Sequence, residues 1–261
     1  MAGTDVDTRA GGATAFVVLA GGSGARVGAE VNKVYLPLAG RRVVSWSFAW
    51  AREVPQVRRF VLVVRAEDAD LARATLAAEV PGLAVDVVVG GATRHDSEQA
   101  ALDHLAPAVT RGDLDVIALH DGARPLAGPA LVRSVVTTAD RVGGAVPAVP
   151  AEALLPVDVD GRPTHPDGAD GAGSAFGAVH PDRRLARVQT PQAFRAAALC
   201  AAYAAAATDG YRGTDTASSL EAYGGIAVRI VPGSRQNLKV TYRHDLALAE
   251  RLLAGHGYRL P

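Results

Sequence analysis

The sequence predicts a doubly wound α/β fold, in which helices cover both faces of a mostly parallel sheet. Strand-like and helix-like segments alternate from residue 15 to about residue 150. The strand-like segments are nearly continuous runs of Val, Ile and Leu, as expected for parallel strands that are buried on both faces. The chain has 261 residues and can bury a substantial core. In folds of this class, ligands bind at the carboxyl ends of the strands.

The expected elements follow in a regular order. The apolar run AFVVLA (15–20) predicts the first strand, and the stretch 43–54 predicts the first helix. Further strands are expected over 58–64, 83–91, 114–121 and 143–150, alternating with helices over 67–80, 95–109 and 128–142. The alanine-rich stretch 187–210 predicts a helix with Gly210 as its C-cap, followed by a strand over 226–233, a short strand-like segment over 237–241 and a helix over 242–255.

The stretch 151–187 interrupts this alternation. It is rich in Gly, Asp and Pro and is too long for an ordinary connection within a compact domain. We therefore expect it to form an arm that projects from the domain and packs against a second copy of the chain, because it has few apolar residues to bury by itself. The predicted organisation is a disordered tail over 1–13 and a single domain over 14–261 that carries this arm.

Composition narrows the class of function. Lys plus Arg and Asp plus Glu both number 27, so the formal net charge is zero, which argues against a nucleic-acid-binding protein. The sequence has no apolar run of membrane-spanning length and no apolar segment like that of a signal peptide, so we expect a cytoplasmic protein with no membrane partner. The single cysteine, Cys200, is interpreted as a small buried residue.

A glycine-rich loop follows the first strand. Residues 20–28 read AGGSGARVG, which matches neither the P-loop nor the dinucleotide-binding spacing. Its glycines can nevertheless turn backbone N–H groups inward to hold an anion, and Arg26 and Lys33 can neutralise a polyphosphate. A tight turn with surface cations is the alternative interpretation.

Two further charged residues are candidates for the site. Asp121 ends an apolar strand, where it can hold a divalent cation or merely cap the following loop. Lys239 lies in the short segment NLKVT and is either a solvated charge or a second phosphate contact. No zinc-ligand spacing and no G-x-S-x-G motif is present.

Taken together, the motifs resemble one family. LAGGSGARVGAEVNKVYLPLAG, VVGGATRHDSEQAAL, LHDGARP, VQTPQAF, GTDTASSLEAYG and QNLKVTYRHDLALAE occur in the order found in 2-C-methyl-D-erythritol 4-phosphate cytidylyltransferases of isoprenoid biosynthesis. The resemblance spans about residues 15–253. It implies a Rossmann-like nucleotidyltransferase fold, and a homodimer that uses magnesium to form a CDP-alcohol and pyrophosphate from CTP and a polyol phosphate.

The resemblance also implies roles for individual residues. Arg26 and Lys33 would bind the CTP phosphates, and Lys239 would act on the α-phosphate in the transition state. The nucleotide would lie against Ala20, Gly21, Gly22, Gly24, Gly91, Ala92 and Ser97. Asp121 would lie near magnesium and the substrate alcohol, and the residues that line or support the substrate side would be Arg124, Thr190, Thr214 and Asp215. No covalent nucleophile is needed, since this chemistry depends on in-line positioning and on cations.

The chain departs from the family pattern on the acceptor side. Residues 153–156 read ALLP where the family has an Asp-Thr-Ile/Leu-Lys run. Asp182 occupies the position of an arginine on the arm, so Arg183 or Arg184 must supply the positive charge for a phosphorylated acceptor. Two alternatives therefore stay open: a cytidylyltransferase for another polyol phosphate, such as ribitol 5-phosphate, and a homologue that binds CTP without turnover.

Overall fold

The structure is a computed structural model that describes residues 13–22, 32–151, 186–211, 216, 220 and 223–255. Its sheet strands are β1 (Thr14–Leu19), β4 (Val57–Val64), β5 (Val85–Val89), β6 (Val116–Asp121), β7 (Gly143–Pro150), β8 (Ala186–Val188), β9 (Gln192–Arg195) and β10 (Ala227–Pro232). The helices are α1 (Val43–Ala51), α2 (Ala69–Glu79), α3 (Arg94–Thr110), α4 (Gly128–Val142), α5 (Ala196–Thr208) and α7 (Arg243–Gly255). A small ribbon of β2 (Pro37–Leu38) and β3 (Arg41–Arg42) precedes α1.

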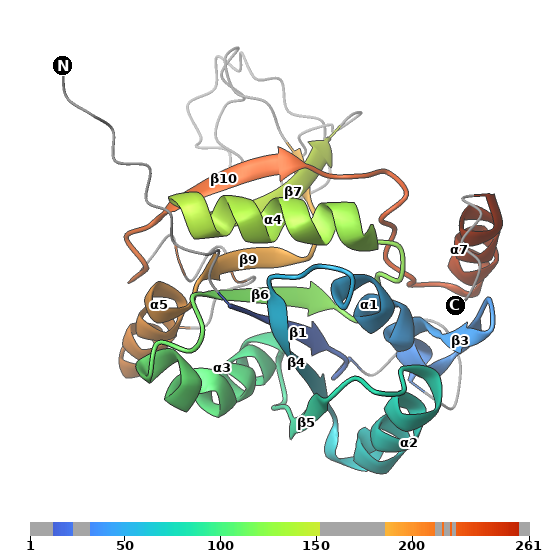
Figure 1. Cartoon of the computed structure of the whole chain (residues 1–261), viewed down its shortest axis with the longest axis horizontal. Coiled ribbons are helices and arrows are strands. Elements are labelled where there is room, and N and C mark those ends of the chain that lie inside the picture. The colour runs from blue at the N-terminus through green and yellow to red at the C-terminus, as the bar shows by residue number, and fades with distance from the viewer. Residues whose placement is uncertain are drawn as a thin grey trace, which may run out of the picture.

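The strands form one mixed sheet in the order β10-β7-β9-β6-β1-β4-β5, with β8 paired to β7 (Figure 1). Strand β1 lies between β4 and β6 and is parallel to both. Strand β9 is antiparallel to its neighbours β6 and β7. The predicted α/β fold with a mostly parallel sheet is therefore confirmed.

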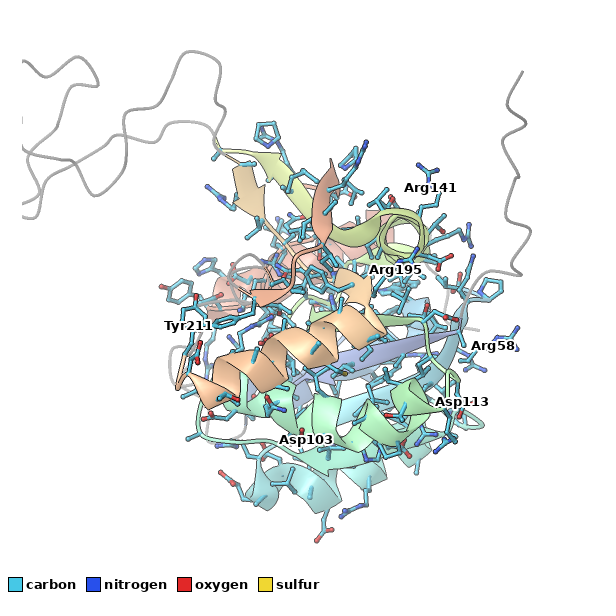
Figure 2. The ribbon with its side chains drawn as sticks, turned by 90° about the vertical axis from the view of Figure 1, so that its left-hand side faces the viewer. Arg58, Asp103, Asp113, Arg141, Arg195 and Tyr211 are labelled. Atoms are coloured by element: carbon cyan, nitrogen blue, oxygen red, sulfur yellow. The ribbon has the colours of Figure 1, made fainter. Side chains whose placement is uncertain are left out.

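The alternation of side chains along β1 explains the layers. Phe16 and Val18 pack in one apolar cluster with residues of α1, α2 and α4. Ala15 and Val17 pack in the opposite cluster with residues of α3 and α5. Helices thus cover both faces of the sheet, and α3 and α5 lie next to each other on one of them (Figure 2).

Two expected elements differ in the structure. The stretch 187–210, expected as a single helix, begins with β8 and β9, and α5 starts only at Ala196. Pairing of β9 with β6 and β7 overrides the helix propensity of its residues, because it fills the interior of the sheet. The expected strand-like segment 237–241 pairs with no strand. The C-cap of α5 is Asp209 rather than the predicted Gly210, which follows it in the left-handed conformation at φ 65° that often ends a helix.

A third apolar cluster fixes the C-terminal helix. Trp46 and Trp50 of α1 stack with their ring centroids 5.2 Å apart and pack with Ala249 and Leu253 of α7. Because α7 directly follows the segment 237–241, this cluster holds the end of that segment near α1 and β2. Among the described residues, no helix has the length and apolar character required to cross a membrane.

Candidate active site

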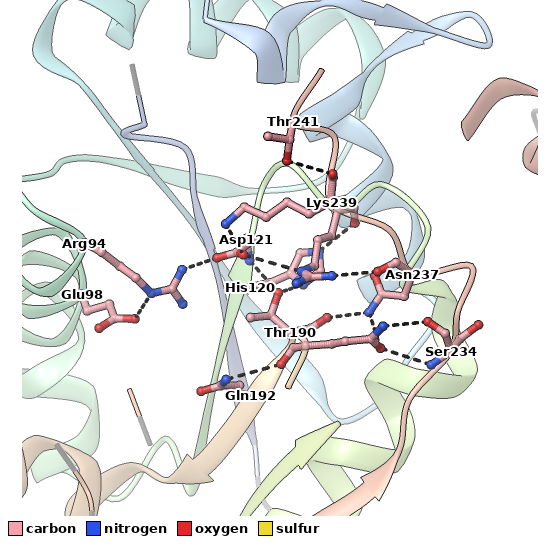
Figure 3. Close-up of polar contacts among 12 residues, drawn as sticks. Arg94, Glu98, His120, Asp121, Thr190, Gln192, Ser234, Asn237, Lys239 and Thr241 are labelled. Carbon is pink, nitrogen blue, oxygen red and sulfur yellow. Dashed lines mark hydrogen bonds and ion pairs between the residues drawn. The ribbon is translucent and has the colours of Figure 1, made fainter. Parts of the chain in front are cut away.

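Asp121, the last residue of β6, is the centre of the candidate active site (Figure 3). It is 7% exposed, and cations surround its carboxylate. Lys239 Nζ lies 2.8 Å from Asp121 Oδ2, and Arg124 Nε lies 3.6 Å from the same oxygen. The guanidinium of Arg94 pairs with the other oxygen, Oδ1. One carboxylate is therefore shared by three basic side chains.

These charges determine the ionisation of the carboxylate. Burial alone would raise the pKa of Asp121, but the positive charges of Arg94 and Lys239 hold it well below its ordinary value. Burial lowers the pKa of Arg94, and the carboxylates of Asp121 and Glu98 more than reverse that effect. Asp121 is thus a fixed anion at neutral pH.

The fold brings the three cations together from separate segments. Arg94 is the first residue of α3, just after β5, and Arg124 lies in the turn after β6. Lys239 lies beyond β10, and the backbone N–H of its neighbour Val240 donates to Ala123 O at 2.8 Å. All three therefore lie near the carboxyl ends of parallel strands, where α/β folds bind ligands.

Asn237 joins the loops that carry these cations. Its side chain is fully buried and donates to Thr190 O at 2.9 Å and to Gln189 Oε1 at 3.3 Å. Its backbone carbonyl accepts a 2.8 Å hydrogen bond from Arg124 Nη1. Gln189 in turn donates from Nε2 to Ser234 O at 2.7 Å. The loops after β6, before β9 and after β10 are therefore fixed to one another.

Thr190 and His120 are linked to Asp121 by a chain of hydrogen bonds. The Asp121 N–H donates to Thr190 Oγ1 at 2.9 Å, and Thr190 Oγ1 lies 3.1 Å from His120 Nδ1. His120 Nε2 lies 3.0 Å from Arg124 O, which can only accept, so the proton is on Nε2 and Nδ1 accepts from the Thr190 hydroxyl. Burial lowers the pKa of His120 to about 4, so the ring is neutral. Thr190 was predicted to line or support the substrate side. In the structure its hydroxyl supports the backbone of Asp121.

The predicted nucleotide residues lie beside this centre. A side chain at Gly21 would contact Ser97 Oγ at 3.4 Å, so the start of the glycine-rich loop lies against the N-terminus of α3. A Cβ at Gly91 would lie only 2.3 Å from Asp96 Cβ, so this turn requires glycine for close packing. Ala20 directly follows β1 and is buried, whereas Gly22 and Ala92 are exposed. Thus Gly21, Gly91 and Ser97 form one side of the site.

Lys33 lies at the other end of the glycine-rich loop. Its neighbour Asn32 donates from Nδ2 to Ala20 O at 2.8 Å and to Asp68 Oδ2 at 3.1 Å, which ties the end of the loop to its beginning. Lys33 is 9% exposed. It belongs to a short 3-10 turn (Lys33–Tyr35) that packs against α1.

The other predicted residues lie outside the described part of the chain. These are Gly24 and Arg26 of the glycine-rich loop, Asp182, Arg183 and Arg184 of the arm, residues 153–156, and Thr214 and Asp215. Their predicted roles stay predictions.

Sequence reasoning missed four residues that build the site: Arg94, Glu98, His120 and Asn237. Each lies inside a motif that carries the family resemblance, so position within a motif was the available signal. A second signal is the use of lysine. Lys33 and Lys239 are the two lysines of the chain, and every other basic residue among the 27 is arginine. An ammonium is a compact point charge and is not interchangeable with a guanidinium. The use of lysine at these two positions alone therefore favours a specific chemical role.

Comparisons with known proteins point to one family. The family model described as 2-C-methyl-D-erythritol 4-phosphate cytidylyltransferase matches residues 14–255. The chain is 37% identical over 244 residues to the enzyme of that name from Cereibacter sphaeroides, covering 92% of this chain and 97% of the relative. It is 35% identical to the one from Syntrophotalea carbinolica, covering 91% and 94%.

A solved structure from Anaerococcus prevotii, titled 4-diphosphocytidyl-2C-methyl-D-erythritol synthase, superposes with a TM-score of 0.75 at 22% identity, covering 94% of this chain and 97% of the other, which supports the fold. The family model and the relatives cover nearly the whole described chain, including Asp121 and its three cations. The chain therefore belongs to the 2-C-methyl-D-erythritol 4-phosphate cytidylyltransferase family.

Proposed function

We propose that the chain transfers CMP from CTP to 2-C-methyl-D-erythritol 4-phosphate and releases pyrophosphate. An oxygen of the acceptor phosphate attacks the α-phosphorus of CTP and forms the new P–O bond. The bond from the α-phosphorus to the bridging oxygen breaks, and its electron pair leaves with pyrophosphate. Charge develops on the phosphoryl oxygens in the transition state, so positioned cations lower the barrier.

The observation that carries this proposal is the set of cations around Asp121. Lys239 is 42% exposed at its side chain, whereas the Asp121 side chain is 10% exposed, so the ammonium is the group that an entering phosphate can reach. His120 is engaged at both ring nitrogens and cannot serve as a base. The described site thus fits a reaction that needs orientation and positive charge and no covalent nucleophile.

Magnesium is part of the proposal. Among the described residues, no three His, Cys, Asp or Glu side chains cluster as a metal site. One carboxylate suffices if phosphates supply other ligands, since Mg²⁺ commonly binds one or two carboxylates together with substrate phosphates and water. Asp121 would be that ligand. Magnesium would neutralise phosphate charge, while Lys239 and Arg124 orient the reacting groups.

We further propose that the enzyme acts as a homodimer in the cytoplasm, where CTP is available. The supporting argument is the polar arm, which has little apolar surface to bury by itself.

An assay of pyrophosphate release tests the reaction. CTP is incubated with magnesium and one of three acceptors: 2-C-methyl-D-erythritol 4-phosphate, ribitol 5-phosphate or erythritol 4-phosphate. We expect the highest kcat/KM with the methylerythritol phosphate and no product without magnesium. If kcat/KM were highest with ribitol 5-phosphate, that compound would be the acceptor in place of 2-C-methyl-D-erythritol 4-phosphate. CTP binding without product from any acceptor would favour the non-catalytic alternative.

A further inference from the structure

Arg94 pairs with Asp121, and a second buried carboxylate, that of Glu98, also holds its guanidinium. Glu98 lies one turn further along α3 and is 1% exposed. Its Oε1 lies 3.0 Å from Arg94 Nε and accepts a 2.7 Å hydrogen bond from Thr216 Oγ1. Its Oε2 accepts from the Tyr203 hydroxyl at 2.5 Å. The Arg94 guanidinium is therefore held at one edge by Glu98 and pairs with Asp121 through another nitrogen (Figure 3).

This arrangement has a consequence for Lys239. Lys239 is paired with Asp121 in the structure. If the proposed function holds, Lys239 must turn its ammonium toward a phosphate of CTP. A buried carboxylate that loses a partner is strongly destabilised unless other cations compensate it, and in the proposed function these are magnesium and Arg94. Arg94 binds the opposite oxygen of Asp121 and can stay in place when Lys239 leaves.

We infer that Arg94 is a positioning residue, which keeps Asp121 paired so that Lys239 is free to move to the nucleotide, and that Glu98 fixes Arg94 for this role. The inference rests on the proposed function for the destination of Lys239. The sharing of Asp121 between Arg94 and Lys239 does not depend on that proposed function. Arg124 also faces Asp121, but its Nε is 3.6 Å from Oδ2 and its Nη1 is bonded to Asn237 O, so Arg94 makes the closer contact with the carboxylate.

Steady-state kinetics provide the first test. Arg94→Gln removes the charge but keeps a polar side chain. We expect kcat to fall by about thirtyfold and KM for CTP to change by less than about threefold, because Lys239 acts mainly in the transition state. Arg94→Lys restores a cation beside Asp121 and should recover much of the loss. Glu98→Gln should also lower kcat, but by a smaller factor than Arg94→Gln.

The matched control is Arg111→Gln at the other end of α3. Arg111 also pairs with an aspartate, Asp113, at 2.8 Å, but both side chains are exposed. This variant should keep wild-type kcat and KM. Circular dichroism and thermal unfolding identify variants that fail to fold. An Arg94→Gln protein that folds and retains wild-type kcat would overturn the inference, as would an equal loss in Arg94→Lys.

Nuclear magnetic resonance provides a test that does not require turnover. Because Lys33 and Lys239 are the chain's two lysines, ¹³Cε-labelled lysine gives two assignable environments, with Lys33→Arg identifying each. Without nucleotide, Arg94→Gln should shift the Lys239 signal and Arg111→Gln should not. Addition of CTP should move the Lys239 signal in the wild-type protein and much less in Arg94→Gln.

The two proposals fail in different ways. A wild-type protein that makes no product from any acceptor contradicts the proposed function, and the nucleotide-free spectra still decide whether Arg94 and Lys239 share Asp121. An unchanged Lys239 signal in nucleotide-free Arg94→Gln overturns the positioning role, even if the wild-type protein is active.

Discussion

The Lys239 ammonium is paired with Asp121 at 2.8 Å, although Lys239 is the most exposed of the three cations around that carboxylate. An exposed ammonium with an anionic partner is held in one place before the substrate arrives. An incoming phosphate therefore competes with Asp121 for a positioned charge, which agrees with a role in the transition state.

Replacing either lysine tests this role. We expect Lys239→Ala and Lys33→Ala each to lower kcat by about a hundredfold or more, the scale for losing one positioned transition-state contact. Lys239→Arg should not restore wild-type activity, because a planar guanidinium cannot reproduce a point charge. Pyrophosphate release measures the effect, with Arg229→Ala on the exposed face of β10 as the control. Near-wild-type turnover in both alanine variants would show that the active site lies elsewhere.

Nucleotide selection should depend on the turn before α3. A side chain at Gly91 would meet Asp96 Cβ at 2.3 Å, so Gly91→Ala must displace the turn that faces Ser97. We expect CTP affinity to fall by about tenfold or more, since a pocket that hydrogen-bonds a base loses selectivity when its donors move. Isothermal titration calorimetry with CTP, UTP and ATP measures the change. Gly255→Ala, where a Cβ meets nothing within 4 Å, is the control. Equal wild-type affinity for ATP and CTP would contradict the cytosine assignment.

Stability should fall in mildly acidic solution because of His120. Burial lowers the pKa of His120 to about 4 from an unperturbed value of 6.5. As the pH drops below 6.5, the unfolded chain binds a proton that the native protein excludes. The free energy of unfolding should therefore decrease down to about pH 4, by about 3 kcal/mol in total from this group.

Urea unfolding at several pH values tests the His120 prediction. His120→Gln should remove this part of the pH dependence, whereas His244→Gln, at an exposed position, should leave it unchanged. An identical slope for wild-type protein and His120→Gln between pH 6.5 and pH 4 would refute the prediction.

Variants of the predicted arm (151–187) test which residues bind the acceptor. Asp182 repels a phosphate, so we expect Arg183 and Arg184 to supply the charge to the partner's acceptor site. Replacing both with alanine should raise the acceptor KM by about tenfold and leave CTP binding nearly unchanged. Light scattering should find a dimer. A monomer, or an unaltered acceptor KM, would exclude this account of the arm.

The sequence was sufficient for most strands of the sheet, its helices and the position of Asp121, because apolar runs and their alternation are local signals. It was insufficient for β9, whose position depends on pairing with β6 and β7 rather than on local propensity. It was also insufficient for the pair formed by Arg94 and Glu98. Glu98 accepts hydrogen bonds from Tyr203 and Thr216, which lie more than a hundred positions away in the chain.

The bond from Arg124 to Asn237 spans 113 positions, nearly half of the polypeptide. Contacts of such large sequence separation require costly loop closure and slow folding. During synthesis, the ribosome releases Arg124 and its strand long before Asn237 and Lys239 emerge. A nascent chain that lacks Asn237 and Lys239 therefore cannot assemble the complete candidate site, and a ligand of that site can stabilise the fold only after both residues have emerged.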